Sequence, residues 1–360
     1  MLRKAAALIL VCVSIAMWTS CTTTSNDYLY AAVPSSSEIV AYREDPNSGV
    51  LTQLAVSPIT AGQGVQSVVI HPSKKYLYAA NSGSNNISLY TISSTGSLSE
   101  VTPRANAGTV PTLLAIDSSG SYLYVGNSAS FDVSVFSIDA STGVLSPVLQ
   151  TAGTTAGVGT SPLDMKLSPS GNFLYLTGQG LPAGFIEVFP VTKGVLGAPV
   201  AGSPFQTGSG PFGLAIDSAG KFLYTANKLD GSISEFTING DGSLTPLQNS
   251  PIGQAYISPV SLQIDNSGKY LYVANQGSTN LSGFSIGSNG ALTLLTASPF
   301  ATGSNPTFVG TDATGKYLFV GSQGSTSAVE SFSLDTSSGT LTEVASYSVP
   351  GTATSIAATP

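Results

Sequence analysis

The sequence LAIDSAGKFLYTAN, residues 214–227, decides the fold because related versions of it recur along the chain. It contains an apolar strand that ends at Asp217, a turn at residues 218–221, and a second strand built on Phe222-Leu223-Tyr224. This core of a leucine between aromatic residues recurs in seven places, centred on Leu29, Leu77, Leu123, Leu174, Leu223, Leu271 and Leu318. Successive leucines are 46 to 51 residues apart, a spacing typical of a repeated supersecondary unit.

Each unit continues in the same way after its second strand. A loop rich in Gly, Ser and Asn leads to a third strand such as ISEFTI at residues 233–238. A hairpin at residues 239–242 then leads to a fourth strand at residues 243–247. Apolar and polar residues alternate along these segments, as they do in half-buried strands. Four short antiparallel strands per unit form the blade of a β-propeller, so the sequence predicts an all-β, seven-bladed β-propeller.

The two ends of the repeat region complement each other. The first unit starts with its second strand, at residues 27–32, and has no innermost strand of its own. The sequence TSIAA at residues 354–358 matches the innermost strand LLAI at residues 113–116. We therefore predict that the C-terminal strand completes blade 1 and covers a sheet edge that would otherwise stay open.

The N-terminus has the features of an export signal. Arg3 and Lys4 precede an apolar run at residues 5–17, and a small residue stands directly before Cys21. The segment resembles the bacterial lipoprotein signal, in which that cysteine is lipidated and becomes the new N-terminus. Trp18 departs from the aliphatic residue usual in this motif, and ordinary secretion with cleavage nearby is the alternative.

This signal divides the chain into three predicted parts. Residues 1–21 form the signal, residues 22–26 a short tether, and residues 27–360 the propeller. The chain has two cysteines, Cys12 and Cys21, so residues 22–360 can form no disulfide and supply no thiolate. We expect an exported protein of the cell envelope whose lipidated Cys21 is anchored in the membrane.

Composition excludes several classes of function. Charged residues make up 9% of the chain, against roughly 25% in an average soluble domain. The formal net charge is −7, with 12 Lys and Arg residues in total. Nucleic-acid binding needs clustered cations, so we expect no nucleic-acid partner.

The repeat strings resemble a known family. LYVAN at residues 271–275 and YLYVGN at residues 122–127 each follow an Asp-x-x-Gly turn. They are similar to the seven-bladed lactonase propellers, also called the cycloisomerase 2 or 6-phosphogluconolactonase-like family, which are related to the YVTN-repeat propellers. The resemblance covers residues 27–360 and implies the propeller fold and lactone hydrolysis of the 6-phosphogluconolactonase type.

The family's catalytic residues do not transfer to this chain by position. Characterised members of the cycloisomerase branch carry a His just after the Pro that opens an innermost strand, with Arg and Glu partners nearby. The corresponding residues of this chain are Thr112, Leu163, Phe212, Val260 and Thr307. The resemblance therefore supports the fold more strongly than the activity.

Four other ionisable residues are candidates for catalysis on the face of the long loops. Asp132 and Asp164 could act as general bases, with Arg104 or Lys228 stabilising an oxyanion. The alternative for Asp164 is a structural pair with Lys166, two residues further along the same strand.

Polar residues at the ends of the second strands are candidates for ligand binding at the channel mouth. In this interpretation amides from several blades surround the mouth and bind a carbohydrate, a lactone or a protein; the residues are Asn81, Asn127, Gln179, Asn227, Asn275 and Gln323. The alternative is that the asparagines close the following turns by bonding nearby backbone.

We expect no metal site and no cofactor, because the chain has one histidine, His71, in a turn position that Asp holds in other units. The leading functional interpretation is an envelope-anchored binding module for a neutral polar ligand or a protein, without enzyme activity. Its alternative is a lactone hydrolase of the 6-phosphogluconolactonase type.

Overall fold

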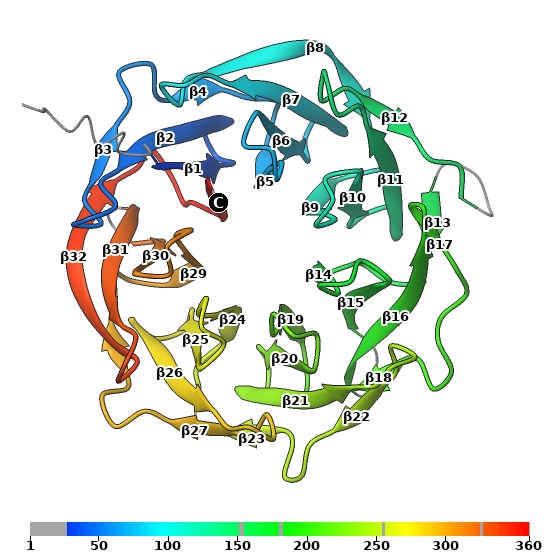
Figure 1. Ribbon diagram of the computed structural model, residues 1–360, viewed down its shortest axis with the longest axis vertical. Helices are drawn as coiled ribbons and strands as arrows, with labels where there is room; N and C mark the ends of the chain where they lie inside the picture. Colours follow the sequence, from blue (N-terminus) through cyan, green and yellow to red (C-terminus); the bar gives the residue numbers. More distant parts are fainter. Residues whose placement is uncertain (1–26, 151–154, 180–182, 254–255, 325–326, 360) are drawn as a thin grey trace, which may run out of the picture.

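The chain folds into a ring of seven antiparallel β-sheets around a central axis (Figure 1). The computed structural model describes residues 27–150, 155–179, 183–253, 256–324 and 327–359, and confirms the predicted all-β, seven-bladed β-propeller. The predicted signal, the tether and Cys21 lie outside the described residues. Within them, no helix is long and apolar enough to cross a membrane.

The first two strands of each blade lie nearest the axis. The innermost strands of blades 1 to 7 are β33 (Ser355–Ala358), β5 (Val65–Ile70), β9 (Pro111–Ile116), β14 (Asp164–Leu167), β19 (Pro211–Ile216), β24 (Pro259–Ile264) and β29 (Pro306–Thr311). The second strands are β1 (Asp27–Val33), β6 (Tyr76–Asn81), β10 (Tyr122–Asn127), β15 (Phe173–Gln179), β20 (Phe222–Asn227), β25 (Tyr270–Asn275) and β30 (Tyr317–Ser322).

The third and fourth strands form the outer part of each blade. The third strands are β2 (Glu38–Glu44), β7 (Asn86–Ile92), β11 (Asp132–Ile138), β16 (Gly184–Thr192), β21 (Ser232–Ile238), β26 (Asn280–Ile286) and β31 (Ala328–Asp335). Blades 2 and 7 have continuous fourth strands, β8 (Leu98–Asn106) and β32 (Thr340–Ser348). In the other blades two short pieces pair with the third strand: β3 (Leu51–Gln53) and β4 (Ile59–Thr60), β12 (Leu145–Pro147) and β13 (Thr155–Gly157), β17 (Val195–Leu196) and β18 (Phe205–Gln206), β22 (Leu244–Pro246) and β23 (Ile252–Gly253), β27 (Leu292–Leu294) and β28 (Phe300–Ala301).

A Ser-Pro dipeptide compensates for the split in four of these outer strands. The serine hydroxyl accepts a third-strand N–H that the interrupted fourth strand leaves without a backbone partner. Ser57 Oγ accepts from Ala41 N at 2.8 Å, and Ser250 Oγ accepts from Glu235 N at 2.8 Å. Ser203 and Ser298 make the same kind of bond to Val188 N and Gly283 N.

The repeated tyrosine of the second strand links five of the seven blades to the next one. Tyr30 Oη donates to the carbonyl of Gly96 at 2.7 Å, and Tyr78 Oη donates to the carbonyl of Gly143 at 2.7 Å. The same bond recurs from Tyr175, Tyr224 and Tyr272. Gly96 has φ of +77°, and a Cβ there would lie 2.2 Å from the Tyr28 ring, so the hairpin needs glycine at that position.

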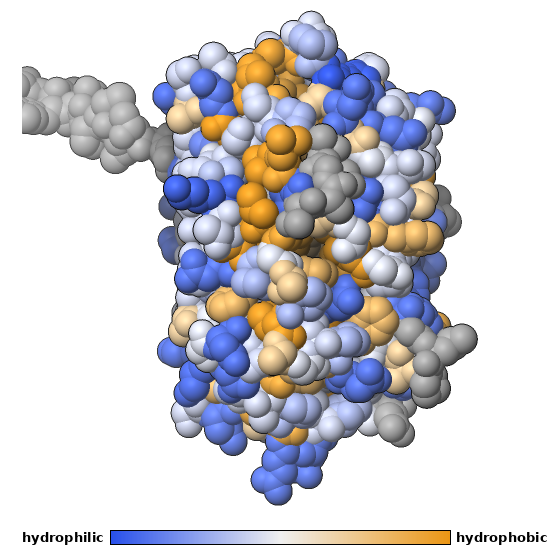
Figure 2. All heavy atoms as spheres, turned by 90° about the vertical axis from the view of Figure 1, so that its right-hand side faces the viewer, coloured by the Kyte–Doolittle hydropathy of each residue, from blue (hydrophilic) through white to orange (hydrophobic). Residues whose placement is uncertain are grey.

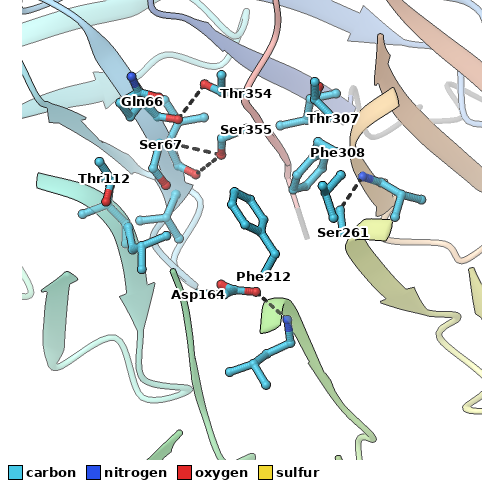
Figure 3. A pocket seen from close by; sticks show the side chains of 18 of the residues that line it. Gln66, Ser67, Thr112, Asp164, Phe212, Ser261, Thr307, Phe308, Thr354 and Ser355 are labelled. Atoms are coloured by element: carbon cyan, nitrogen blue, oxygen red, sulfur yellow. Dashed lines mark hydrogen bonds between the residues drawn. The ribbon is translucent and has the colours of Figure 1, made fainter. Parts of the chain in front are cut away.

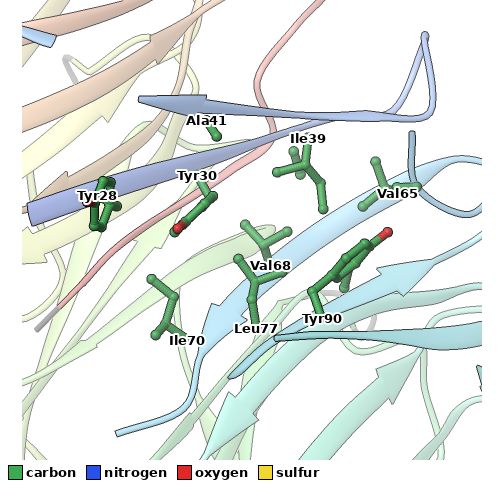
Figure 4. Close-up of a cluster of buried hydrophobic side chains, with 12 residues drawn as sticks. Tyr28, Tyr30, Ile39, Ala41, Val65, Val68, Ile70, Leu77 and Tyr90 are labelled. Carbon is green, nitrogen blue, oxygen red and sulfur yellow. The ribbon is translucent and has the colours of Figure 1, made fainter. Parts of the chain in front are cut away.

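The hydrophobic core is divided into clusters between neighbouring blades. Figure 4 shows the cluster of blades 1 and 2, where Tyr30 and Ile39 pack against Leu77 and Tyr90. A similar cluster joins blades 7 and 1, and includes Ile356 from the C-terminal strand. Each blade is therefore stabilised mainly by apolar contact with both of its neighbours.

The C-terminal strand closes the ring, as predicted. Strand β33 pairs antiparallel with β1, with Leu29 opposite Ala358 and Ala32 opposite Ser355, so the first and last described strands lie side by side (Figure 1). Tyr28 N donates to Thr359 Oγ1 at 2.9 Å, and Thr359 N donates to the carbonyl of Tyr28 at 2.8 Å. Blade 1 is thus assembled from both ends of the propeller sequence.

The flank of blades 3 and 4 mixes apolar and polar side chains (Figure 2). Leu149 and Val144 of blade 3 are 73% and 45% exposed. Apolar side chains therefore reach the surface of this flank.

Candidate functional site

The innermost strands surround a cavity of about 310 Å³ on the axis of the ring. A second cavity, of about 360 Å³, lies where these strands begin. Both are lined by the same residue position in every blade, and these residues are called the mouth ring: Thr354, Gln66, Thr112, Leu163, Phe212, Val260 and Thr307. The cavity of about 360 Å³, called the mouth, therefore joins the cavity of about 310 Å³, called the channel.

Two ionisable side chains, those of Asp164 and Lys166, line the channel. Both belong to β14 and are two residues apart, so they project from the same side of the strand. Among the described residues, no other ionisable side chain lines the channel or the mouth. The channel therefore places one carboxyl group and one ammonium group against a neutral lining.

Backbone hydrogen bonds hold the Asp164 carboxylate in place. Its Oδ1 accepts from Met165 N at 2.7 Å, and its Oδ2 accepts from Leu214 N in blade 5 at 2.7 Å (Figure 3). The Asp164 N–H donates to Oγ1 of Thr177, a buried residue of β15, at 2.8 Å. Each carboxylate oxygen keeps further acceptor capacity, because an ionised carboxylate has about four lone-pair sites.

Burial raises the pKa of Asp164 above that of an ordinary aspartate, while the positive charge of Lys166 and the two backbone N–H donors oppose the increase. Desolvation disfavours the charged carboxylate, whereas a nearby cation favours it. A base with a raised pKa holds a proton more strongly once it has taken one from water. The two side chains can therefore act together in a hydrolysis that passes through an oxyanion.

Asp164 and Lys166 form no ion pair within 4 Å. The ion pair found among the described residues joins Arg104 Nε and Glu100 Oε1 at 2.6 Å. This pair lies on β8, the outermost strand of blade 2. Arg104, a candidate on the face of the long loops, thus has two strands between it and the innermost strand and lines neither cavity. The residues around Pro103 belong to this edge strand, which continues to Asn106.

The asparagines that end four second strands lie inside their blades. Asn81, Asn127, Asn227 and Asn275 are 0%, 0%, 0% and 2% exposed, and none lines the mouth or the channel. Each side-chain amide donates to two side chains of the following strand; that of Asn127 donates to Asp132 Oδ1 at 2.7 Å and to Ser134 Oγ at 2.9 Å. The geometry favours a structural role in closing the loop, through side-chain partners rather than the expected backbone.

Asp132 is one of these partners and does not reach the channel. Its Oδ1 also accepts from Ser130 Oγ at 3.0 Å, and it begins β11, the third strand of blade 3. Two strands separate it from the axis. The structure therefore does not bring Asp132 together with Asp164.

In blades 3, 5 and 6 the residue after the asparagine approaches the mouth, because consecutive side chains of a strand point in opposite directions. Ser128 and Gln276 occupy this position in blades 3 and 6 and line the mouth. Lys228 occupies it in blade 5, with its Nζ 4.8 Å from the centroid of the Phe212 ring. Gln179 and Gln323 hold the position in blades 4 and 7 and are exposed, but they are not part of the mouth lining.

Sequence reasoning did not single out Phe212, Gln66 and Thr112 as lining residues of the mouth. Thr112 and Phe212 hold two of the positions at which the family that this chain resembles carries its histidine. The sequence shows that no histidine stands there, but it does not show that the residues present line a cavity. His71 lies elsewhere and is buried; its ring nitrogens contact Ser73 Oγ and the carbonyl of Gly120, each at 2.8 Å.

Comparison with known proteins gives a family match along nearly the whole propeller. The model of the family described as "Lactonase, 7-bladed beta-propeller" matches residues 23–162 and 164–357. A 6-phosphogluconolactonase of Pectobacterium carotovorum is 27% identical over 200 residues, which cover 53% of this chain and 59% of the relative. A 6-phosphogluconolactonase of Pectobacterium atrosepticum is 26% identical over the same shares. The chain thus matches less than two thirds of the length of these curated relatives.

Solved structures share the fold at low sequence identity. The periplasmic gluconolactonase of Pseudomonas aeruginosa is 22% identical, with a TM-score of 0.74, and the match covers 91% of this chain and 98% of that one. A protein from Lactobacillus plantarum is 21% identical, with a TM-score of 0.77 and coverage of 92% and 98%. Identity at this level supports the common fold alone.

These findings correct the leading functional interpretation. The expected binding module without enzyme activity is contradicted by the lactonase family match and by relatives named as 6-phosphogluconolactonases, which favour the lactonase alternative. The missing histidine does not exclude hydrolysis, because a carboxylate can also act as a general base, and Asp164 places a carboxyl group in the channel.

Proposed function

Because this chain belongs to the family of seven-bladed β-propeller lactonases, we propose that it hydrolyses the ring ester of a sugar lactone in its channel. The observation that carries the proposal is the pair Asp164 and Lys166, which face the same cavity from one strand. The relatives named as 6-phosphogluconolactonases support a sugar lactone as the substrate class.

Asp164 is the general base of the proposed reaction. Its carboxylate removes a proton from a water molecule as the water oxygen adds to the lactone carbonyl carbon. The tetrahedral intermediate then breaks its bond to the ring oxygen, and protonated Asp164 returns the proton to this leaving oxygen. The product is the open-chain hydroxy acid, and Asp164 regains its charge.

Lys166 stabilises the negative charge that develops on the carbonyl oxygen. Its side chain is exposed to the channel, and its ammonium group is a point charge on a flexible stem. Such a group is worth most where little water screens it, as in a narrow cavity. Lys166 also favours the ionised form of Asp164, so it keeps the base available at lower pH.

The substrate proposed here is unphosphorylated. A phosphate group is normally bound by several converging Arg or Lys donors. In the described part of the chain, Lys166 is the one cation that lines the channel or the mouth, and it stands beside the proposed base. Lys228 contacts the ring of Phe212 at the edge of the mouth.

The proposal includes export and a lipid anchor at Cys21. It rests on the N-terminal sequence and is supported by the periplasmic name of the Pseudomonas aeruginosa protein. With radiolabelled palmitate, the full chain should be labelled in a bacterial host and recovered with membranes. The Cys21→Ser variant should lose both properties; label that persists in this variant would contradict the anchor.

The test of the activity is a proton-release assay with purified full-length protein. Glucono-δ-lactone and 6-phosphoglucono-δ-lactone are compared, each corrected for its spontaneous hydrolysis. We expect turnover of the neutral lactone to exceed that of the phosphorylated one, and Asp164→Asn to reduce it by about 10² to 10⁴, the usual contribution of a general base. Absence of turnover with both lactones, or an Asn variant as active as the original chain, would overturn the proposal.

A further inference from the structure

The mouth ring has a polar side and an apolar side. Blades 7, 1, 2 and 3 contribute Thr307, Thr354, Gln66 and Thr112, whereas blades 4, 5 and 6 contribute Leu163, Phe212 and Val260. Polar residues thus occupy four consecutive blades, and apolar residues the other three. A ligand that fills the mouth meets hydrogen-bonding groups on one side and hydrocarbon on the other.

On the polar side, two residues are free to bind a ligand. Thr307 Oγ1 donates to the carbonyl of Ala353 at 2.7 Å, and Thr354 Oγ1 donates to the carbonyl of Gln66 at 2.8 Å. These two hydroxyl protons are therefore used within the propeller. Within the described residues, the Gln66 amide and the Thr112 hydroxyl have no hydrogen-bond partner, although both line the mouth. They can supply both donors and acceptors to a ligand.

On the apolar side, Phe212 is the prominent residue. Its side chain points into the cavity (Figure 3), and the residue remains 38% exposed. Lys228 Nζ lies 4.8 Å from the centroid of its ring, and the Lys228 N–H donates to the carbonyl of Gly210 at 2.8 Å. Because Gly210 directly precedes β19, this bond fixes the Lys228 backbone beside the strand that carries Phe212.

A sugar ring matches this division. Its ring carbons present C–H groups on a face that packs well against an aromatic ring, while its hydroxyl groups project from the edge. A simple aliphatic lactone has the same reactive ester but no hydroxyl groups. Sites that hydrogen-bond a ligand's hydroxyls discriminate strongly against analogues that lack them, because the polar groups of the site then stay unpaired.

We propose that Phe212 is a specificity-determining residue that stacks on the C–H face of the lactone ring while Gln66 and Thr112 bind its hydroxyl groups. Lys228 is a positioning residue, which keeps the Phe212 ring oriented through its contact with the ring. The assignment of the ligand as a lactone rests on the proposed function, whereas the recognition of a hydroxylated ring does not require turnover.

The experiment therefore measures binding, by titration calorimetry with the full chain. The probe is glucono-δ-lactam, in which a ring N–H replaces the ester oxygen and prevents ready hydrolysis. The control probe is δ-valerolactam, the same six-membered ring without hydroxyl groups. We expect the original chain to bind the hydroxylated lactam more tightly, and Phe212→Ala to weaken that binding about tenfold, the effect of losing one buried aromatic contact.

Two further variants separate recognition from general damage. Phe131→Ala removes an aromatic residue that is 50% exposed and lies outside both cavities, so its affinity for the lactam should be unchanged. Gln66→Ala should weaken binding of glucono-δ-lactam but not of δ-valerolactam, because only the former offers hydroxyl groups.

Lys228 is tested through its dependence on Phe212. Lys228→Met should weaken lactam binding by about threefold, and Lys228→Arg should restore it, since a guanidinium also packs on an aromatic face. In the Phe212→Ala background, Lys228→Met should have no further effect, a coupling that an independent structural role would not produce.

The outcomes distinguish this inference from the proposed function. If lactam binding depends on Phe212 but the protein hydrolyses no lactone, the proposed recognition of a hydroxylated ring is supported and the proposed lactonase activity is contradicted. If the protein hydrolyses glucono-δ-lactone but Phe212→Ala changes neither lactam affinity nor KM, the inference is overturned and the proposed activity still holds. Equal affinity of the original chain for both lactams, or no binding of either, would also overturn it.

Discussion

Blade 4 and blade 6 make the same inter-blade hydrogen bond with different acceptors. In blade 6, Ser261 Oγ accepts from Val309 N of the next blade at 3.2 Å. In blade 4, the residue at the same register position is Asp164, whose Oδ2 accepts from Leu214 N at 2.7 Å. Blade 1 uses the same acceptor as blade 6: Ser355 Oγ accepts from Val68 N of blade 2 at 3.3 Å.

The difference shows what the fold needs at this position. A hydroxyl oxygen is enough to satisfy the N–H of the next blade, so the bridge does not require a charge. A carboxylate in the same place loses part of its hydration, which is why burial raises the pKa of Asp164. The bridge alone therefore does not need a charge, and the proposed chemistry in the channel gives a reason for one.

The largest expected effect comes from giving blade 4 the acceptor of blade 6. Asp164→Ser should lower lactone turnover by about 10² to 10⁴, since the base is lost. It should unfold at nearly the same denaturant concentration as the original chain, because serine can still accept the Leu214 N–H. Asp164→Ala should be equally inactive and also less stable, by about 1–3 kcal/mol, because that N–H loses its partner.

Ser261→Ala is the matched control for this pair. It should lower the free energy of unfolding by a similar amount to Asp164→Ala while leaving turnover unchanged. If Asp164→Ser keeps its activity, or if Ser261→Ala abolishes turnover, the distinction between the two blades fails.

The second effect concerns the cation of the channel. Lys166→Met should reduce kcat by about 10² to 10³, as expected for loss of an oxyanion-stabilising group. Asp164 must be ionised to act as a base, so activity falls as the pH drops through its pKa. Lys166 lowers that pKa, so its removal should move the acidic limb of the kcat/KM profile to higher pH. Lys166→Arg should keep the limb in place; a limb that stays fixed in Lys166→Met would contradict the assignment.

A smaller effect is expected at a buried carboxyl group far from the channel mouth. Glu44 is 2% exposed, and its carboxyl oxygens have no hydrogen-bond partner among the described residues. Burial, followed by the negative charges of Asp312, Asp27 and Asp45, raises the pKa of Glu44 to about 8. The other six blades have aliphatic residues at this register position: Ile92, Ile138, Val191, Ile238, Ile286 and Leu334.

Glu44 should make the stability of the propeller depend on pH. Because the folded-state pKa lies above the ordinary value of 4.5, folding takes up a proton between about pH 4.5 and pH 8, and stability falls as the pH rises through this range. Glu44→Gln and Glu44→Ile should therefore gain stability over the original chain as the pH rises, by about 4 kcal/mol over the whole range, because each unit of pKa difference contributes about 1.4 kcal/mol. Thermal unfolding from pH 4.5 to pH 8.5 measures the difference, and parallel curves for the three proteins would contradict this account.

Much of the propeller could be predicted from the sequence. The spacing of Leu29, Leu77 and the later leucines gave the number of blades, and the match between residues 354–358 and residues 113–116 gave the closure. Such features repeat, so each copy supports the interpretation of the others. The buried tyrosines that link neighbouring blades belong to the same repeated pattern.

The site was less predictable because its residues depart from the repeat. Asp132 and Arg104 were plausible by type, but the structure places them in the third strand of blade 3 and the outermost strand of blade 2. The asparagines were one residue away from the positions that approach the mouth, an error that reverses the direction of a strand side chain. Asp164 and its neighbour Lys166 could be named from the sequence, whereas the contact of Lys228 with the Phe212 ring could not, because it joins the end of one strand to the start of another.

The sequence by itself determined the repeat, the alternation of apolar and polar residues in its strands, and the complementarity of its two ends. Local patterns and contacts between similar neighbouring units specify these features. Only the tertiary structure decided which side chains share the axis, because seven strands from distant parts of the chain meet there. The bridge from Asp164 to Leu214 and the place of Phe212 in the mouth both depend on contacts between blades that no single repeat contains.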